Sequence, residues 1–185
     1  MLKVSIGKFG IRREILNLFT FDLKKEVPSP SRPVAIHEKL VRSELIDEKI
    51  LKARLGQGDL LFRAEKEGKE LGYIFGAVRE TGVSEIEAHL IVANDEVYLY
   101  DAFVRPEFRG QGIYPELLKA ALNYFKGKKR RALIFTTASN RMSRRGIEKA
   151  GFFHYQTVIF YNLFGIKFYR FGRKEKHVRS YLKAE

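Results

Sequence analysis

The fold is decided by a stretch that runs from Val104 to Leu118 and reads VRPEFRGQGIYPELL. In it a strand ends, a loop with two glycines follows, and an amphipathic helix begins. Gly110 and Gly112 let backbone N–H groups turn toward a ligand without an intervening Cβ, and the helix N-terminus adds free amides and a positive dipole. Pro115 suits a first helical turn, where no donor is lost. The junction suits a pyrophosphate, although an isolated Gly-x-Gly can also be only a tight turn.

The flanking sequence predicts a mixed α+β sheet. Residues 96–104 form an apolar strand pattern, and Ile113 to Phe125 places its apolar residues on one helical face. A polar turn joins the strand patterns at 60–64 and 71–78, which suits an antiparallel hairpin. Further patterns predict strands at 34–36, 89–93, 132–137, 152–161 and 167–171, a helix from Glu38 to about Leu55 and a short helix at 140–150. Runs of strands with few helices between them argue against a parallel Rossmann array.

Prolines suggest how the chain is divided. Residues 27–33 hold three of the five prolines and are interpreted as a linker. This predicts an N-terminal extension and linker at 1–33, one domain at 34–165, and a closing strand with a basic tail at 166–185. Within the extension, Glu14 to Leu23 is rich in apolar and β-forming residues and could be a strand or a short helix.

Composition narrows the class of protein. The length of 185 residues suits a single domain, and the absence of cysteine excludes disulfides, thiol catalysis and cysteine-based zinc sites. The four histidines show no metal-ligand spacing, so no metal is expected. The net charge of +13 would attract any polyanion and does not choose among them. The start at Met1 lacks the pattern of a secretory signal, so the expected location is cytoplasmic.

Two landmarks in order resemble the GNAT superfamily of N-acetyltransferases. Residues 109–114 fall on its Gln/Arg-x-x-Gly-x-Gly/Ala signature, after a Val-x-Pro turn at 104–106. Downstream, Asn140 opens a short helix that ends in Gly151-Phe152, like the second landmark of the superfamily. The resemblance covers about 34–162 and is strong from Tyr98 to Phe152.

The resemblance implies a fold, a reaction and a cosubstrate. The strands at 96–104 and 132–137 would splay apart, and the pantetheine of acetyl-CoA or another acyl-CoA would lie between them. A neutral amine would attack the thioester directly, while a backbone N–H stabilises the developing oxyanion. No metal is required. The positions implied for cofactor binding are Phe103, Val104, Arg109, Gly110, Gln111, Gly112, Ile113, Tyr114 and Asn140.

Two positions depart from the pattern of the superfamily. Tyr114 stands where glycine or alanine is usual, so its ring must point away from the pyrophosphate or contact it. Ile147 occupies the helix position that often carries a general-acid tyrosine, and it cannot donate a proton. Asn140 either contacts the cofactor or caps its helix.

The catalytic residues are less well defined. The strand position that holds glutamate in histone-acetylating relatives falls on Tyr98, and a tyrosine is a poor base near neutral pH. Asp101 is the nearest alternative, because burial in an apolar strand would raise its pKa and favour proton acceptance. A structural hydrogen bond is an equal alternative for Asp101. A register shift of one residue would turn Tyr98 or Tyr100 toward the substrate instead.

A second functional class also stays open. Residues 167–183 interleave aromatic side chains with lysine and arginine, which suits an anionic membrane surface and, less well, single-stranded nucleic acid. The chain could therefore be a non-enzymatic basic binding protein on a GNAT-like scaffold, or this segment could be only a closing strand with a solvated tail. In the enzyme, the amine acceptor could be an amino sugar, a polyamine, a protein amine or an envelope precursor. The sequence leaves the oligomeric state open, a homodimer included.

Overall fold

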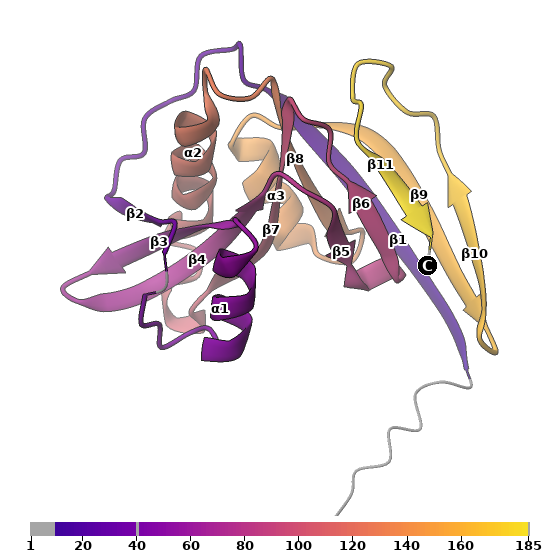
Figure 1. Ribbon diagram of the computed structural model, residues 1–185, viewed down its shortest axis with the longest axis horizontal. Coiled ribbons are helices and arrows are strands. Elements are labelled where there is room, and N and C mark those ends of the chain that lie inside the picture. The colour runs from indigo at the N-terminus through magenta and orange to yellow at the C-terminus, as the bar shows by residue number, and fades with distance from the viewer. Residues whose placement is uncertain (1–9, 40, 185) are drawn as a thin grey trace, which may run out of the picture.

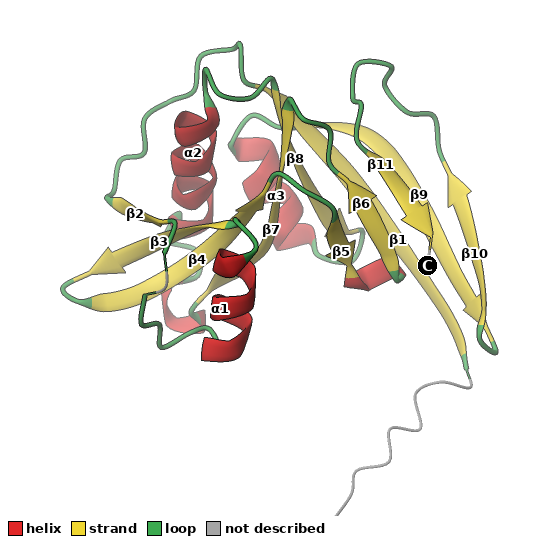
Figure 2. Cartoon of the chain, viewed as in Figure 1, coloured by secondary structure: helices red, strands yellow, loops and turns green. Residues whose placement is uncertain are grey.

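The computed structural model describes residues 10–39 and 41–184, which form two β-sheets and three α-helices (Figure 1, Figure 2). The large sheet contains, in spatial order, β10 (Ile166–Phe171), β9 (Phe153–Leu163), β1 (Ile11–Asp22), β8 (Arg131–Thr137), β7 (Glu96–Val104), β4 (Lys69–Ala77), β3 (Leu60–Lys66) and β2 (Val34–His37). The small sheet contains β11 (Tyr181–Ala184), β6 (Ala88–Ile91) and β5 (Thr81–Val83). The helices are α1 (Glu48–Gly56), α2 (Ile113–Phe125) and α3 (Arg141–Lys149), with 3-10 turns η1 (Ser84–Ile86) and η2 (Pro106–Phe108).

The large sheet is mixed, as predicted. Strands β7 and β8 pair in parallel, and the other strand pairs of the described chain are antiparallel. One face packs against α2 and α3, where Leu99 and Phe62 meet the apolar side of α2. The opposite face packs against α1 and the small sheet, which buries Leu51 and Leu90. Each element thus hides its apolar side against the large sheet, which is the main gain in free energy on folding.

The prediction that residues 1–33 lie outside the domain is wrong for 11–22; residues 1–9 lie outside the described residues. Strand β1 is inserted between β8 and β9, and Leu16 pairs with both Thr137 and Val158. Its side chain is fully buried. The proline segment that follows crosses the molecule to β2 and is held on α2, since Asn123 Nδ2 donates to the Pro28 carbonyl at 3.1 Å. The prolines therefore mark a fixed crossover inside one domain, because both of its ends enter the same sheet.

Two further elements differ from the sequence prediction. The helix expected from Glu38 begins only at Glu48, because Asp47 accepts from the first-turn amides at 2.9 and 3.3 Å and acts as its N-cap. Residues after β10 are more than a solvated tail, since they return as β11 and pair with β6. The buried Glu96 holds this return by accepting from the backbone amides of Arg179 and Ser180 at 2.9 and 2.8 Å.

Candidate functional site

Strands β7 and β8 separate halfway along their length. Their pairing runs from Glu96 with Arg131 to Leu99 with Ile134 and stops there, although β7 continues to residue 104 and β8 to residue 137. On their outer sides the two strands stay paired, β7 with β4 and β8 with β1. The predicted splay is therefore confirmed. It leaves two facing strand edges that can hydrogen bond an extended ligand.

A β-bulge lies at the start of this gap. Tyr100 pairs with Phe75 and Phe103 with Tyr73, so two residues of β7 oppose one of β4. Asp101, the first of the two, has a φ of +46°, in the left-handed region that few non-glycine residues adopt. The extra residue breaks the strand alternation, and Tyr98, Tyr100 and Asp101 all line one pocket.

The glycine loop leads from β7 to α2 and presents mainly backbone. Gly110 and Gly112 have φ angles of +77° and +80°, and a Cβ at either would meet no atom within 4 Å. The backbone amides of residues 110–114 have no acceptor among the described residues. The exposed side chains fold back, since Arg109 Nε donates to the Val104 carbonyl and Gln111 Nε2 to the Glu107 carbonyl, each at 3.2 Å. Open space in front of free amides fits a pyrophosphate.

Tyr114 points from the first turn of α2 toward α3. A Cβ at Gly146 would lie 2.5 Å from Tyr114 Cδ1, so the ring fits only because residue 146 is glycine. The phenol oxygen lies 3.4 Å from Ser143 Oγ, and burial raises the pKa of Tyr114 to about 12. The large residue at this signature position therefore packs between two helices and does not fill the glycine loop.

Helix α3 packs against β8, one of the two strands that border the gap. The Asn140 side chain accepts from the Ser143 amide at 3.0 Å and caps the helix. Ile147 is fully buried in the core, so it contributes packing and no proton donor. Of the two roles expected for Asn140, the cap is observed.

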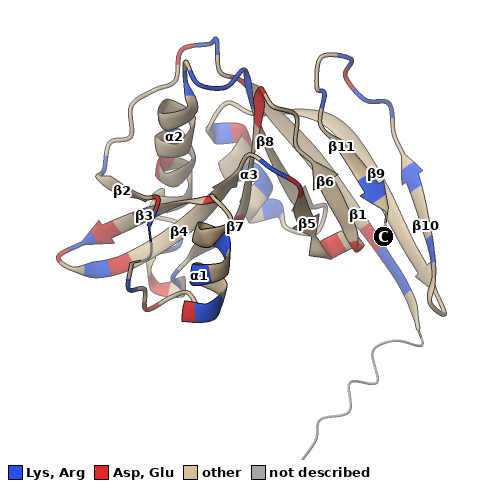
Figure 3. Cartoon of the chain, in the orientation of Figure 1, with Lys and Arg blue, Asp and Glu red and all other residues tan. Residues whose placement is uncertain are grey.

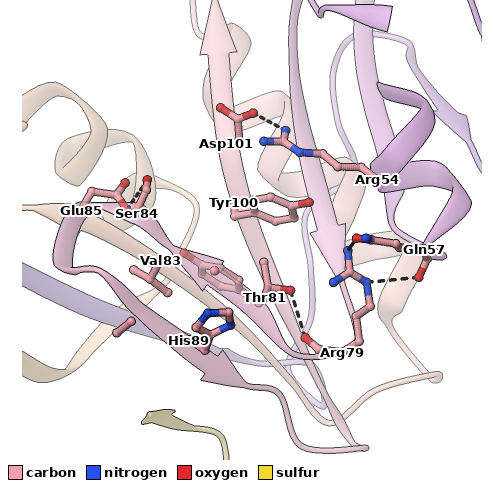
Figure 4. A pocket seen from close by; sticks show the side chains of 13 residues that line it. Arg54, Gln57, Arg79, Thr81, Val83, Ser84, Glu85, His89, Tyr100 and Asp101 are labelled. Atoms are coloured by element: carbon pink, nitrogen blue, oxygen red, sulfur yellow. Dashed lines mark hydrogen bonds and ion pairs between the residues drawn. The ribbon is translucent and has the colours of Figure 1, made fainter. Parts of the chain in front are cut away.

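A pocket of about 500 Å³ opens at the gap, on the sheet face that carries α1 and the small sheet (Figure 4). Its walls come from the end of α1, from the segment through β5 and η1, and from β7. The lining residues are Arg54, Gln57, Arg79, Thr81, Gly82, Val83, Ser84, Glu85, Ala88, His89, Tyr98, Tyr100 and Asp101. Carboxylates, guanidinium groups and phenol rings thus line the same pocket, which suits a polar ligand.

The expectation that Asp101 is buried is wrong. Its side chain is 42% exposed and forms an ion pair with Arg54. The Arg54 guanidinium also lies 4.6 Å from the centre of the Phe75 ring and 5.1 Å from that of Tyr100, so it is held in place from two sides. The reason for expecting easy proton uptake by Asp101, an apolar environment, is therefore absent.

Tyr98 is placed in the pocket wall but is unsuited to act as a base. Its ring is buried and stacks on Tyr100 at 5.6 Å between ring centres, with Phe135 at 4.7 Å. Burial raises the pKa of Tyr98 well above its ordinary value, with smaller contributions from charges such as Glu85. The phenol stays protonated near neutral pH and can only donate or accept a hydrogen bond.

Sequence reasoning missed Arg54, Arg79 and Glu85 of the lining, and also Asp59, which lies behind it. Asp59 is buried, accepts from the Tyr100 hydroxyl, and lies 3.0 Å from Arg79 Nη2. Its Oδ1 has no hydrogen-bond partner among the described residues. Burial raises the pKa of Asp59, and the Tyr100 hydrogen bond and the Arg79 charge partly offset this. The available signal was a carboxylate directly before the apolar strand β3, after the Gly56-Gln57-Gly58 stop.

No cluster of three or more His, Asp or Glu side chains in residues 10–39 and 41–184 is arranged to hold a metal ion. The sequence profile of the Acetyltransferase (GNAT) family matches residues 18–152, which is well over half of the chain. The chain belongs to the GNAT family. The match begins inside β1, the strand that lies between β9 and β8 in the large sheet.

Solved structures share the GNAT fold with this chain. A putative acetyltransferase from the GNAT family of Novosphingobium aromaticivorans gives a TM-score of 0.56 at 13% identity, covering 83% of this chain and 66% of that chain. An acetyltransferase from the GNAT family of Colwellia psychrerythraea gives a TM-score of 0.55 at 17% identity, covering 82% of this chain and 56% of that chain. A GCN5-related N-acetyltransferase of Sphaerobacter thermophilus gives a TM-score of 0.53 at 16% identity, covering 82% of this chain and 51% of that chain. This chain spans about half to two thirds of the length of these structures. A search of curated proteins found no match.

Proposed function

We propose that this chain is an acyltransferase that moves an acetyl or other acyl group from coenzyme A to an amine. The observation that carries the proposal is the separation of β7 from β8 after Leu99 and Ile134, beside a loop whose amides are free. Membership of the GNAT family supports the same class of reaction. The competing idea, a binding protein without catalysis, would give no reason for a strand gap that opens into a pocket.

The donor would be held mostly by backbone groups. We infer that amides of residues 110–114 receive the pyrophosphate, with the Arg109 side chain free to leave the Val104 carbonyl and add charge. Backbone groups near Phe103 and Val104 on β7 would face the pantetheine amides. The thioester of acetyl-CoA supplies the activated acyl group. The chain itself orients it and places backbone donors near the carbonyl oxygen.

The acceptor would occupy the 500 Å³ pocket. Glu85 and Asp101 bring carboxylates to its wall, while Arg54 and Arg79 are already ion-paired with Asp101 and Asp59. Each arginine is cancelled by the carboxylate that it pairs with, so Glu85 supplies the remaining charge of the lining, and a cationic amine fits it better than an anion does. In our proposal Asp101 holds and orients the amine.

Binding of the donor can be tested without knowing the acceptor. Acetyl-CoA should raise the melting temperature of the protein, because a ligand that binds only the folded state stabilises it by mass action. An unchanged melting temperature at saturating acetyl-CoA would refute the proposal. If the protein is stabilised, thiol release with a panel of amines then measures transfer.

The role of Asp101 requires a matched comparison. Asparagine tolerates the left-handed φ of this position, so Asp101→Asn changes charge with little backbone strain. We expect unchanged affinity for acetyl-CoA and a rate of amine acetylation lower by about 10²-fold, because an amine that is not held in place loses its attack geometry. Glu44→Gln is the control, since Glu44 pairs with Arg105 at 2.6 Å outside the pocket. Equal rates in the two variants would remove Asp101 from the reaction.

A further inference from the structure

Within residues 10–39 and 41–184, no element covers one face of the large sheet near the β9–β10 turn. Opposed residues of antiparallel strands share a face, and the pairing of β1, β9 and β10 aligns three rows there. We call this area the outer sheet face. The rows are Ile11, Leu163 and Ile166, then Arg13, Tyr161 and Phe168, then Ile15, Ile159 and Arg170.

The outer sheet face is apolar and open. Ile11, Ile166 and Phe168 are 71%, 63% and 50% exposed. None of the seven apolar residues in the rows joins the three apolar clusters of the described chain. Helix α3 covers the same side of the sheet only farther along, where it packs near Phe21 and Phe152. Exposed apolar patches of this kind mark contact sites.

The opposite side of the same strands is covered. There the Tyr169 hydroxyl donates to the carbonyls of Ile86 and Glu87 at 3.0 and 2.8 Å. Glu87 pairs with Arg12 at 3.1 Å and with Lys167 at 3.2 Å. The Glu87 carboxylate therefore balances basic side chains on the covered side, whereas the charged residues in the rows of the outer sheet face are both arginines.

The charge of the outer sheet face indicates which kind of partner could bind there. Strands β9 and β10 contain no Asp or Glu (Figure 3). The charged residues of the rows are Arg13 and Arg170. A second copy docked about a two-fold axis would bring arginines toward arginines. Residues 1–9 of this chain, which lie outside the described residues, carry two lysines and no acidic residue, so they also match poorly in charge. An anionic occupant is the complementary one.

The apolar side chains of the outer sheet face distinguish two anionic partners, single-stranded nucleic acid and a membrane surface. Five of the seven apolar residues of the rows are isoleucine or leucine, and the sole aromatic pair is Tyr161 with Phe168. Single-stranded nucleic acid favours aromatic platforms on which bases stack. Aliphatic side chains flanked by arginine suit the boundary between acyl chains and anionic headgroups. None of the helices in the described ranges is both long and apolar enough to cross a membrane, so contact through them would be peripheral.

We propose that the outer sheet face docks on an anionic membrane surface, with Ile11, Ile166 and Phe168 entering the headgroup region. Arg13 and Arg170 lie beside the lipid phosphates. The sequence predicted such a contact through the aromatic and basic residues 167–183. In the structure, alternate residues of β10 point to opposite faces of the sheet, so only some of these residues lie on the outer sheet face. Phe168 and Arg170 reach the outer sheet face, whereas Tyr169 is turned to the covered side. The pocket opens on the side of α1 and the small sheet, so docking leaves it accessible.

The test is sedimentation of the full chain with vesicles. We expect binding to vesicles of phosphatidylcholine and phosphatidylglycerol in equal parts, weaker binding at high salt, and little binding to phosphatidylcholine alone. The double variant Phe168→Ser with Arg170→Gln should bind about tenfold or more weakly. The double variant Ile50→Ser with Lys52→Gln is the control, because it removes an exposed isoleucine and one charge from α1, outside the pocket.

Several outcomes would overturn the proposal. They are absence of binding to the anionic vesicles, equal binding to both kinds of vesicle, and equal losses in the two double variants. Two more measurements address the other occupants. If sedimentation velocity shows a dimer that the Phe168 variant abolishes, the face belongs to a second copy. If removal of residues 1–9 abolishes vesicle binding, that segment and not the outer sheet face is what contacts the lipid. Both results would refute membrane docking as the role of this face.

Discussion

Replacement of Gly112 by alanine tests the glycine loop against a closely matched control. Gly112 has a φ of +80° and Gly127, in the turn between α2 and β8, a φ of +78°. At both positions a Cβ would meet no atom within 4 Å. Alanine at either should therefore cost roughly 1–2 kcal/mol of stability through the left-handed backbone alone. For a domain of this size that lowers the melting temperature by about 2–8 °C.

The two variants should differ in ligand binding. A methyl group at Gly112 would enter the open space in front of the loop amides, while one at Gly127 lies in a different turn. Loss of one amide hydrogen bond to a phosphate corresponds to about 1.5–3 kcal/mol. We therefore expect affinity for coenzyme A to fall roughly tenfold to a hundredfold in Gly112→Ala and to stay unchanged in Gly127→Ala.

Calorimetric titration with coenzyme A measures the affinities, and circular dichroism melts measure the stabilities. Equal stability losses with a selective loss of affinity in Gly112→Ala would support the assignment of the loop. If Gly112→Ala binds coenzyme A as tightly as the unmodified chain, the pyrophosphate does not lie there. If both variants lose affinity alike, the effect comes from folding, and the reasoning is also refuted.

Three further predictions concern the surroundings of the gap. Asn140→Ala should cost about 1 kcal/mol in a chemical unfolding curve and leave the affinity for coenzyme A unchanged, since the side chain caps α3; reduced affinity at unchanged stability would assign it to the cofactor instead. Tyr100→Phe should raise the pKa of Asp59 further, because the ionised carboxylate loses a donor, and NMR titration of the carboxyl carbon would contradict this by showing no rise or a fall. Gly146→Ala should cost about 1–3 kcal/mol through its clash with the Tyr114 ring; an equal cost in a Tyr114→Ala background would rule the clash out.

The strand, loop and helix from Glu96 to Phe125 were predictable because their signals are local. The two glycines need left-handed φ angles, and the apolar spacing of α2 reports the face that it buries. The short α3 with Asn140 as its cap follows from equally local patterns. The family resemblance added the gap between β7 and β8, which no local pattern encodes.

Placement of β1 and Asp101 could not be predicted, because both depend on distant partners. The pattern of residues 14–23 allows a strand, but its neighbours β8 and β9 lie more than a hundred residues later in the chain. The exposure of Asp101 results from a bulge, which resets the alternation of β7, and from Arg54, which arrives on α1. Asp59 becomes part of the site only through Tyr100 and Arg79, on two other segments.

The interior position of β1 has a consequence for synthesis of the protein. A ribosome completes residues 11–22 early, but their partners at 131–137 and 153–163 emerge roughly 5–30 s later at typical elongation rates. During this interval Leu16, Leu18 and Phe19, all buried in the final sheet, have no native strand beside them. An apolar strand edge of this kind invites aggregation, so the nascent chain should be a substrate for chaperones that bind early. Ribosome profiling of chaperone-bound nascent chains should then show engagement that ends once β9 has left the exit tunnel.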